Sequence, residues 1–275
     1  MTPEILEKLR ALKGSVSTVV LSGSIDDSFA HSLANMRSWC DRQGFHAIEW
    51  VTVPATLVEV GRDEVISHAI KERYDFALQI DADASPFAPD LLAQMLWTAF
   101  VARPDADVVG AYCQLKGSYA PTIDTGSGTW EIHYPGEGIL GVIRTGAHAI
   151  LVKPGICTKF GPPWFRVRRT MRPLDALAEV DNLARIHEDG RNRLTETDTW
   201  QRLMKRAREQ GGGTTSAVGE DSGFCDAVKA AGGNIYVNTD IWVGHVERRV
   251  ITPELLDAEM KKREDKLRAL VGIYP

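Results

Sequence analysis

The sequence contains no long hydrophobic run. Over its 275 residues, no stretch approaches the roughly 18 uninterrupted apolar residues that a membrane-spanning helix needs. Residues 1–16 also lack the apolar segment of a signal peptide, because they carry Glu4, Glu7, Lys8, Arg10 and Lys13. These absences argue against a membrane anchor and against export, so we expect a soluble, cytoplasmic protein.

Cysteine is scarce, and positive charge is not in excess. The four cysteines, Cys40, Cys113, Cys157 and Cys225, lie far apart without paired metal-ligand spacing, so we expect reduced and mostly buried thiols. The net charge of −5 argues against a protein whose whole surface binds polyanions, although it leaves room for a local basic face. A hydrophobic content of 44% and a charged content of 25% are typical of a globular protein.

One short apolar run ends at two aspartates spaced one residue apart. Residues 76–80 alternate in a way that predicts a strand, and the Pro-containing residues 85–89 prevent its simple continuation. Asp81 and Asp83 therefore lie at the carboxyl end of a strand, where open α/β sheets bind ligands. The pair could hold a hard divalent ion completed by a substrate phosphate. It could equally be a solvated turn that caps the next helix, and the spacing alone leaves both interpretations open.

Strands and helices alternate through the first half of the chain. Hydrophobic spacing predicts helices over residues 3–13, 62–71 and 91–100, with a further helix capped by Asp26 and Asp27. The predicted strands between them are residues 17–21, 47–53, 76–80 and 108–112, the second of which should end at Pro54. This alternation predicts a single α/β domain whose mostly parallel central sheet has helices on both faces.

The second half is less regular. Residues 117–138 are expected to form a long loop with a strand at 129–133, followed by strands at 139–143, 147–152 and 234–237. A helix is predicted over residues 195–210, and the triple glycine after it predicts a mobile loop up to Gly219.

Three later groups of residues bear on the role of the aspartate pair. Glu220 and Asp221 begin a predicted helix, where they could simply cap it or could accept a proton from a bound hydroxyl. His245 follows an apolar pair and is either structural or a donor to a metal that Asp83 holds. Arg62 could grip a phosphate or nucleobase, or form an ordinary ion pair with a neighbouring acid.

A basic segment with two aromatic residues covers residues 159–172. It contains no acid. It could offer both positive charge and aromatic stacking to an anionic acceptor, or it could be a solvated or buried loop. Its candidate acceptor contacts are Trp164, Arg166, Arg168 and Arg169.

Taken in order, these pieces resemble the GT-A family of nucleotide-sugar glycosyltransferases, most closely its family 2-like group. The resemblance covers residues 19–246 and rests on an ordered set of short motifs. They are Leu21-Ser22-Gly23-Ser24, Gly61-Arg62-Asp63-Glu64, Asp81-Ala82-Asp83, Gly146-Ala147-His148-Ala149-Ile150-Leu151, Pro163-Trp164-Phe165, Gly219-Glu220-Asp221 and Val243-Gly244-His245. The chain departs from the family at Asp63, where many relatives have Asn, and in the long join between Phe165 and Gly219.

The resemblance implies a Rossmann-like GT-A domain over residues 1–251, with an acceptor-side insertion at 159–219 and a packed C-terminal helix at 252–275. It implies that Asp83 and His245, with Asp81 directly or through water, hold Mn²⁺ or Mg²⁺. Asp221 would be the catalytic base of an inverting transfer, assisted by Glu220. The implied nucleotide-sugar contacts are Ser22, Ser24, Arg62, Asp81, Ala82, Gly146 and Ala147.

The implied activity is transfer of a sugar from a nucleoside-diphosphate sugar, with a UDP-sugar favoured, to an acceptor hydroxyl. One hypothesis for the acceptor is a polyanion such as a hydroxylated DNA base. Two alternatives stay open: a metal-dependent phosphohydrolase or nucleotidyltransferase, and a non-catalytic module that binds a nucleotide sugar or nucleic acid. The lack of a Gly-rich phosphate loop followed by Lys and Ser or Thr argues against the first. The C-terminal stripe of apolar residues leaves both a monomer and a homodimer open.

Overall fold

A central sheet separates two layers of helices. The computed structural model describes residues 1–21, 25–55, 57–113, 122–126, 133–165, 168–170 and 216–246. The elements of the first half are α1 (Pro3–Arg10), β1 (Gly14–Leu21), α2 (Asp27–Arg42), β2 (Ile48–Ala55), α3 (Val58–Lys71), β3 (Phe76–Ile80), β4 (Ala84–Phe87), α4 (Leu91–Trp97), the π-helix η1 (Thr98–Ala102) and β5 (Val108–Tyr112). Those of the second half are β6 (Ile123–Asp124), β7 (Ile139–Val142), β8 (Arg144–Thr145), β9 (Ala149–Val152), the 3-10 helix η2 (Pro154–Lys159), β10 (Arg168–Thr170), β11 (Ser216–Val218), α7 (Glu220–Ala230) and β12 (Ile235–His245).

The main sheet is mixed but mostly parallel, which confirms the predicted fold class. Its strand order is β2-β1-β3-β9-β5-β12-β4, and β7 pairs with β12. Strand β1 is parallel to both β2 and β3, and β5 is parallel to β12. Strand β9 lies antiparallel between β3 and β5. Because β9 runs antiparallel to its neighbours β3 and β5, the amino end of β9 lies beside the carboxyl ends of those strands.

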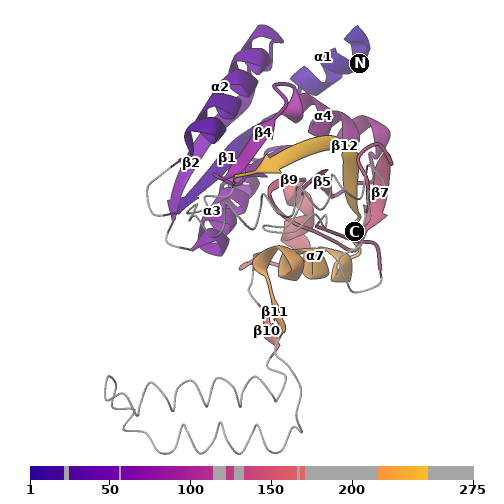
Figure 1. Ribbon diagram of the computed structural model, residues 1–275. Helices are drawn as coiled ribbons and strands as arrows, with labels where there is room; N and C mark the ends of the chain where they lie inside the picture. The colour runs from indigo at the N-terminus through magenta and orange to yellow at the C-terminus, as the bar shows by residue number, and fades with distance from the viewer. Residues whose placement is uncertain are drawn as a thin grey trace, which may run out of the picture. The chain divides into compact units, whose positions relative to one another are not determined.

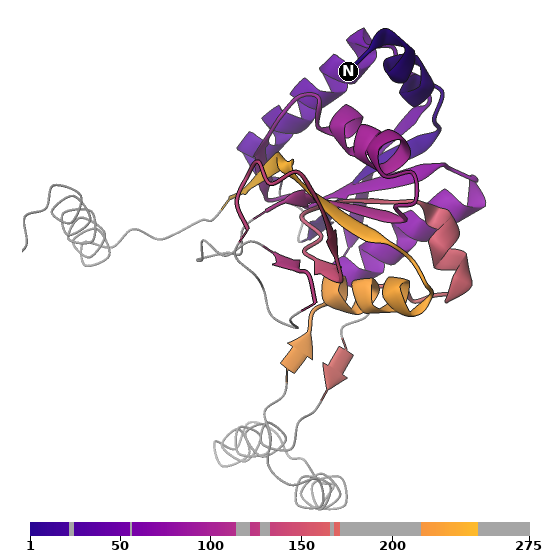
Figure 2. The same ribbon diagram turned by 90° about the vertical axis from the view of Figure 1, so that its right-hand side faces the viewer.

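The two faces of the sheet bury separate hydrophobic clusters. Along β3, Phe76, Leu78 and Ile80 pack into one cluster with residues of α1, α2 and α4. Ala77 packs into the other, with residues of α3, η2 and α7. Successive side chains of a strand point to opposite faces, so the alternation in the sequence supplies both layers. Figure 1 shows α2 and α3 on opposite sides of the sheet, and Figure 2 shows the same arrangement for the indigo α1 and the orange α7.

Two prolines lie within strands, one of them at the position where the second predicted strand was expected to end. Pro54 is part of β2 and Pro86 is part of β4. Both strands are at the ends of the sheet order, so a missing N–H is tolerated on the side that faces away from the ladder. The expectation that β2 ends at Pro54 is therefore wrong, because an edge strand does not need that donor, whereas β3 ends at Ile80 before the proline-containing residues, as expected.

Strand β12 is longer than expected, and Gly244 lets it lie close to β4. The pairing of the two strands shifts register between Val243 and His245, and His245 is opposite Ala84. A Cβ atom at Gly244 would collide with the carbonyl oxygen of Ser85. The glycine thus brings His245 beside the turn that contains the two aspartates.

Several predicted features fall outside the described residues. They are the strand at 129–133 apart from His133, the helix at 195–210, the glycine-rich loop before Ser216, and the C-terminal helix at 252–275. The chain divides into the unit Met1–His245, which contains every element above, and a second unit, Val246–Pro275. Within the described part of the chain, each helix falls short of the length and apolarity that crossing a bilayer would require.

Candidate active site

The Asp81–Asp83 turn joins β3 to β4 at the carboxyl end of β3. The backbone N–H of Asp81 donates to the carbonyl of His148 at 2.9 Å, and the N–H of Ala84 donates to the carbonyl of Asp81 at 2.9 Å. The side chains of Asp81 and Asp83 are 23% and 38% exposed. The turn thus holds both carboxylates at the sheet edge, within reach of solvent.

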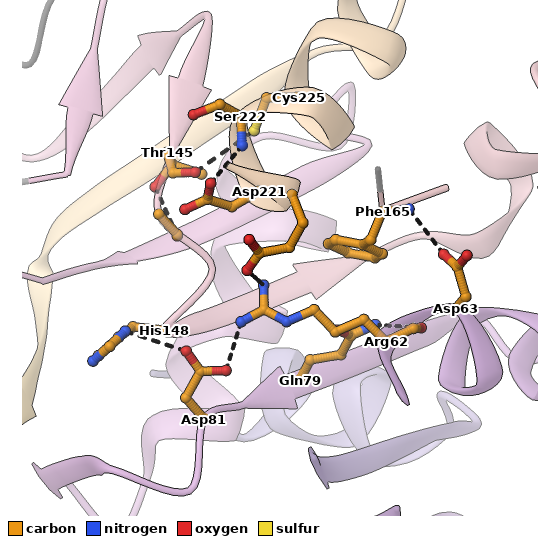
Figure 3. Close-up of polar contacts among 12 residues, drawn as sticks. Arg62, Asp63, Gln79, Asp81, Thr145, His148, Phe165, Asp221, Ser222 and Cys225 are labelled. Atoms are coloured by element: carbon orange, nitrogen blue, oxygen red, sulfur yellow. Dashed lines mark hydrogen bonds and ion pairs between the residues drawn. The ribbon is translucent and has the colours of Figure 1, made fainter. Parts of the chain in front are cut away.

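Arg62 supplies the cation of the site from the middle of α3. Its side chain is only 3% exposed, and its Nη2 donates to Oδ1 of Asp81 at 2.6 Å. Its Nη1 lies 3.8 Å from Oε1 of Glu220. Burial disfavours the charge of Arg62, but the carboxylates of Asp81, Glu220 and Asp221 outweigh it and raise the Arg62 pKa. Figure 3 shows the guanidinium between Asp81 and the first turn of α7. The alternative pair of Arg62 with the acids next to it in sequence is not what the structure shows.

Aromatic packing holds Arg62 in this position. Its guanidinium carbon lies 5.5 Å from the ring centroid of Phe165. Phe165 in turn stacks on Phe224 of α7, with centroids 4.3 Å apart and planes at 11°. The backbone N–H groups of Trp164 and Phe165 both donate to Oδ1 of Asp63, at 2.9 and 2.8 Å. Asp63 therefore anchors this loop and places Phe165 against Arg62.

Two histidines complete the cluster around the aspartates. His245 Nε2 lies 3.3 Å from Oδ2 of Asp83, and His148 Nδ1 lies 3.3 Å from Oδ2 of Asp81. The two imidazole centroids are 3.8 Å apart. Burial lowers the pKa of His148, but its contacts with Asp81 and Cys113 outweigh burial and raise the pKa to about 10. Burial raises the pKa of Asp81, yet the charges of Arg62 and His148 bring it below its ordinary value.

Two overlapping groups of these side chains could hold a metal ion. One consists of Asp81, Asp83 and His148, and the other of Cys113, His148 and His245. In each group the ligand atoms lie within 4.8 Å of one another. Sequence reasoning identified neither His148 nor Cys113 as part of the site. The only signal was the presence of His148 in the Gly146–Leu151 motif, because its approach to Asp81 depends on the antiparallel course of β9.

The acid pair at the start of α7 splits into two environments. Glu220 faces Arg62, and burial raises its pKa despite that cation. Asp221 Oδ1 accepts the backbone N–H of Ser222 at 2.6 Å, which fixes the orientation of the carboxylate. Arg144 of β8 holds the helix in place, because its Nε donates to Oδ1 of Asp226 at 2.7 Å.

The remaining predicted contacts are more dispersed. Ala82 lies in the aspartate turn, whereas Gly146 and Ala147 are buried in the connection from β8 to β9. A Cβ atom at Gly146 would lie 2.8 Å from Cβ of Thr122, so this glycine is required for packing. Ser22, Ser24 and Arg166 are outside the described residues.

The expectation that Trp164 offers a stacking surface to an acceptor is wrong. The side chain is 7% exposed and belongs to the core cluster that includes α3 and α7. Its indole Nε1 donates to the carbonyl of Cys157 at 2.9 Å, which satisfies the polar edge of the ring inside the protein. The backbone of Arg168 and Arg169 forms part of β10, which pairs with β11.

The fold and site define an α/β protein with a cluster of acids and imidazoles at the carboxyl end of its parallel strands. No protein-family model and no curated protein sequence matches the chain. Among solved structures, A197 from STIV matches with a TM-score of 0.51 at 15% identity, over 86% of this chain and 87% of A197. That similarity supports the fold.

Two further solved structures match less well. CMP:2-keto-3-deoxy-manno-octonic acid synthetase in complex with CTP has a TM-score of 0.38 at 11% identity, over 94% of this chain and 98% of that one. Mannosyl-3-phosphoglycerate synthase from Rubrobacter xylanophilus has a TM-score of 0.34 at 14% identity, over 75% and 77%. TM-scores this low support no argument about function, so the function must be argued from the site.

Proposed function

We propose that the protein is a metal-dependent GT-A-type glycosyltransferase that moves a sugar from a nucleoside-diphosphate sugar to an acceptor hydroxyl. The observation that carries the proposal is the 3.3 Å contact of Asp83 Oδ2 with His245 Nε2, across 162 residues of sequence. This contact forms beside the buried Arg62–Asp81 pair and the acids that begin α7. Acids, imidazole and cation therefore converge where an α/β sheet binds its ligands.

The residues of the turn fit a hard divalent ion. Two ligand atoms each about 2.1 Å from one ion, and roughly at right angles, are about 3.0 Å apart, close to the observed Asp83–His245 separation. Asp81 is less suited to direct coordination, because its two oxygens contact Arg62 and His148. Asp83 and His245 are thus the proposed ligands of Mn²⁺ or Mg²⁺, and Asp81 positions Arg62 and His148. When bound, the ion would act as a Lewis acid toward the departing diphosphate.

Arg62 acts in this scheme as a positioning residue. With only 3% of its side chain exposed, it holds Asp81 and Glu220 rather than contacting the nucleotide. The proposed nucleotide contacts are then Ser22, Ser24 and Ala82, whereas Gly146 and Ala147 are buried. A UDP-sugar is the favoured donor.

Asp221 is the proposed base of an inverting transfer. The acceptor oxygen bonds to the anomeric carbon while the bond from that carbon to the diphosphate breaks, and Asp221 takes the hydroxyl proton. The hydrogen bond from Ser222 fixes Oδ1, so Oδ2 is the oxygen that would receive the proton. Glu220, paired with Arg62, orients the sugar.

The acceptor hypothesis of a hydroxylated base in DNA now rests on Arg166, Arg168 and Arg169 alone, because Trp164 is buried. Its test is the salt dependence of acceptor binding. Neutralising several phosphates requires affinity to fall steeply between low and high salt, so a flat response removes a polyanionic acceptor.

The function is tested with nucleoside diphosphates, nucleoside triphosphates and nucleotide sugars, each with and without Mn²⁺, first by thermal shift and then by product analysis. Sugar transfer yields a glycoside plus a nucleoside diphosphate, whereas nucleotidyl transfer from a triphosphate releases pyrophosphate. We expect Asp221→Asn to abolish product while donor binding persists. Asp41→Asn, an exposed acid of α2, should change neither. Undiminished turnover in Asp221→Asn would show that Asp221 is not the base. Pyrophosphate release would favour a nucleotidyltransferase over a glycosyltransferase.

A further inference from the structure

Three potential ligands of another kind meet behind the aspartate turn. Cys113 directly follows β5, His148 directly precedes β9, and His245 ends β12. Strands β9, β5 and β12 are consecutive in the sheet, and the reversed direction of β9 brings all three residues to the same edge. Their ligand atoms lie within 4.8 Å of one another. No short sequence spacing connects them, so only the sheet order reveals the group.

His148 is oriented as a metal ligand would be, because a carboxylate already contacts one of its two ring nitrogens. Its Nδ1 contacts the carboxylate of Asp81 at 3.3 Å. The opposite nitrogen, Nε2, is buried and makes no hydrogen bond of normal geometry to a described residue, although a contact with the Cys113 side chain contributes to the raised pKa of His148. Metal-bound histidines characteristically hold a carboxylate on one nitrogen and the ion on the other.

The chemistry of the donor set selects the ion. A thiolate and two imidazoles are borderline-soft ligands, which suit Zn²⁺ and Co²⁺, whereas Mg²⁺ and Mn²⁺ prefer oxygen. Around a tetrahedral Zn²⁺, with bonds of about 2.3 Å to sulfur and 2.0 Å to nitrogen, ligand atoms are roughly 3.3–3.5 Å apart. The side chains would close by about an ångström to bind. Three protein ligands leave one position open, which Asp83 flanks at 3.3 Å from His245 Nε2 and 3.9 Å from His148 Nε2.

We propose that Cys113, His148 and His245 form a second metal site, selective for Zn²⁺, that shares His245 with the hard-ion site of the aspartate turn. Zn²⁺ drawn toward Cys113 engages His245 and so withdraws it from Asp83. Occupancy of the thiolate site by Zn²⁺ therefore removes His245 from the ligands that would hold Mn²⁺ or Mg²⁺. Zinc binding itself is independent of the glycosyltransferase proposal, whereas the inhibition of transfer that follows from the competition rests on it.

The test uses Co²⁺ as a spectroscopic substitute for Zn²⁺, titrated into the full-length protein. We expect the charge-transfer absorption of a Co²⁺–thiolate bond, which Zn²⁺ displaces. Cys113→Ser should abolish the absorption, and Zn²⁺ affinity should fall at least about 100-fold, since even outer-shell changes cost about 10–100-fold. Cys40→Ala, a buried thiol in α2, is the matched control and should keep it. Asp83→Asn should also keep it, although that variant loses the proposed hard-ion ligand.

His245→Asn provides a second variant that leaves the thiol untouched, and it decides the question if Cys113→Ser does not fold. We expect it to weaken Zn²⁺ binding by a similar factor. The proposal is overturned if the wild-type protein gives no thiolate absorption at saturating Co²⁺, or if Zn²⁺ affinity is unchanged in every variant of Cys113→Ser and His245→Asn that folds. Because the readout is metal binding, either result is separable from the presence or absence of sugar transfer.

Discussion

The substitution Arg62→Met examines the buried cation on which the site is built. Arg62 is 3% exposed and lies 2.6 Å from Asp81 and 3.8 Å from Glu220. Methionine retains most of the side-chain length and the contact with Phe165, but it removes the charge. Glu220 then loses its cation, and Asp81 keeps only its contact with His148.

Removing one partner of a buried ion pair costs about 3–5 kcal/mol. Asp81 and Glu220 are 23% and 22% exposed, so water relieves part of the penalty, and we expect a loss near the lower limit, about 3 kcal/mol. For a chain of this size, each kcal/mol lowers Tm by about 2–4 °C. The expected decrease is therefore roughly 6–12 °C.

The assay is urea and thermal unfolding of a double-mutant cycle. Asp81→Asn should be less harmful in the Arg62→Met background than in the wild type, with a coupling energy of about 1–3 kcal/mol. Arg42→Met, at the exposed end of α2, is the control and should stay within about 0.5 kcal/mol. A loss below about 1 kcal/mol for Arg62→Met, or strictly additive effects in the cycle, would refute this account of the pair.

Three further predictions concern the turn and its supports. Asp63→Ala leaves two backbone N–H donors unpaired and should cost about 2–4 kcal/mol of unfolding free energy. Asp63→Asn keeps an acceptor oxygen and should cost much less. Equal losses in the two variants would exclude the hydrogen bonds as the cause. Gly244→Ala must displace β12 from the carbonyl of Ser85. In the wild type, a nucleoside diphosphate with Mn²⁺ should stabilise the fold by about 2.7 kcal/mol at 100 times Kd, and the variant should lose this stabilisation. If the stabilisation persists, the close approach of the two strands is not needed for binding. Because the folded-state pKa of Asp81 lies below its ordinary value of 3.8, its stabilisation is present above that pH and declines as the pH falls through the lower value. The gap in unfolding free energy between wild type and Asp81→Asn should accordingly narrow from pH 7 toward pH 3, and a widening gap would contradict the sign.

The alternation of apolar residues was enough to predict the sheet and its two helical layers. Phe76, Leu78 and Ile80 face one layer while Ala77 faces the other, as a period of two requires. The same local reasoning placed Asp81 and Asp83 at the end of their strand, because an apolar run, a polar turn and a proline follow one another in the sequence. These features depend on neighbouring residues, so the sequence by itself determined them.

Which distant side chains meet at that turn was decided by the tertiary structure. His148 reaches Asp81 only because β9 inserts antiparallel between β3 and β5, and Cys113 joins it only because β5 is the next strand. The basic segment left open whether Trp164 faces an acceptor or lies inside the protein, and the structure places it in the core, where Asp63 and the carbonyl of Cys157 accept its N–H groups. Local periodicity specifies which residues form a strand and which face is buried. The order and direction of strands depend on contacts between segments far apart in the chain, and no short window of sequence contains both partners.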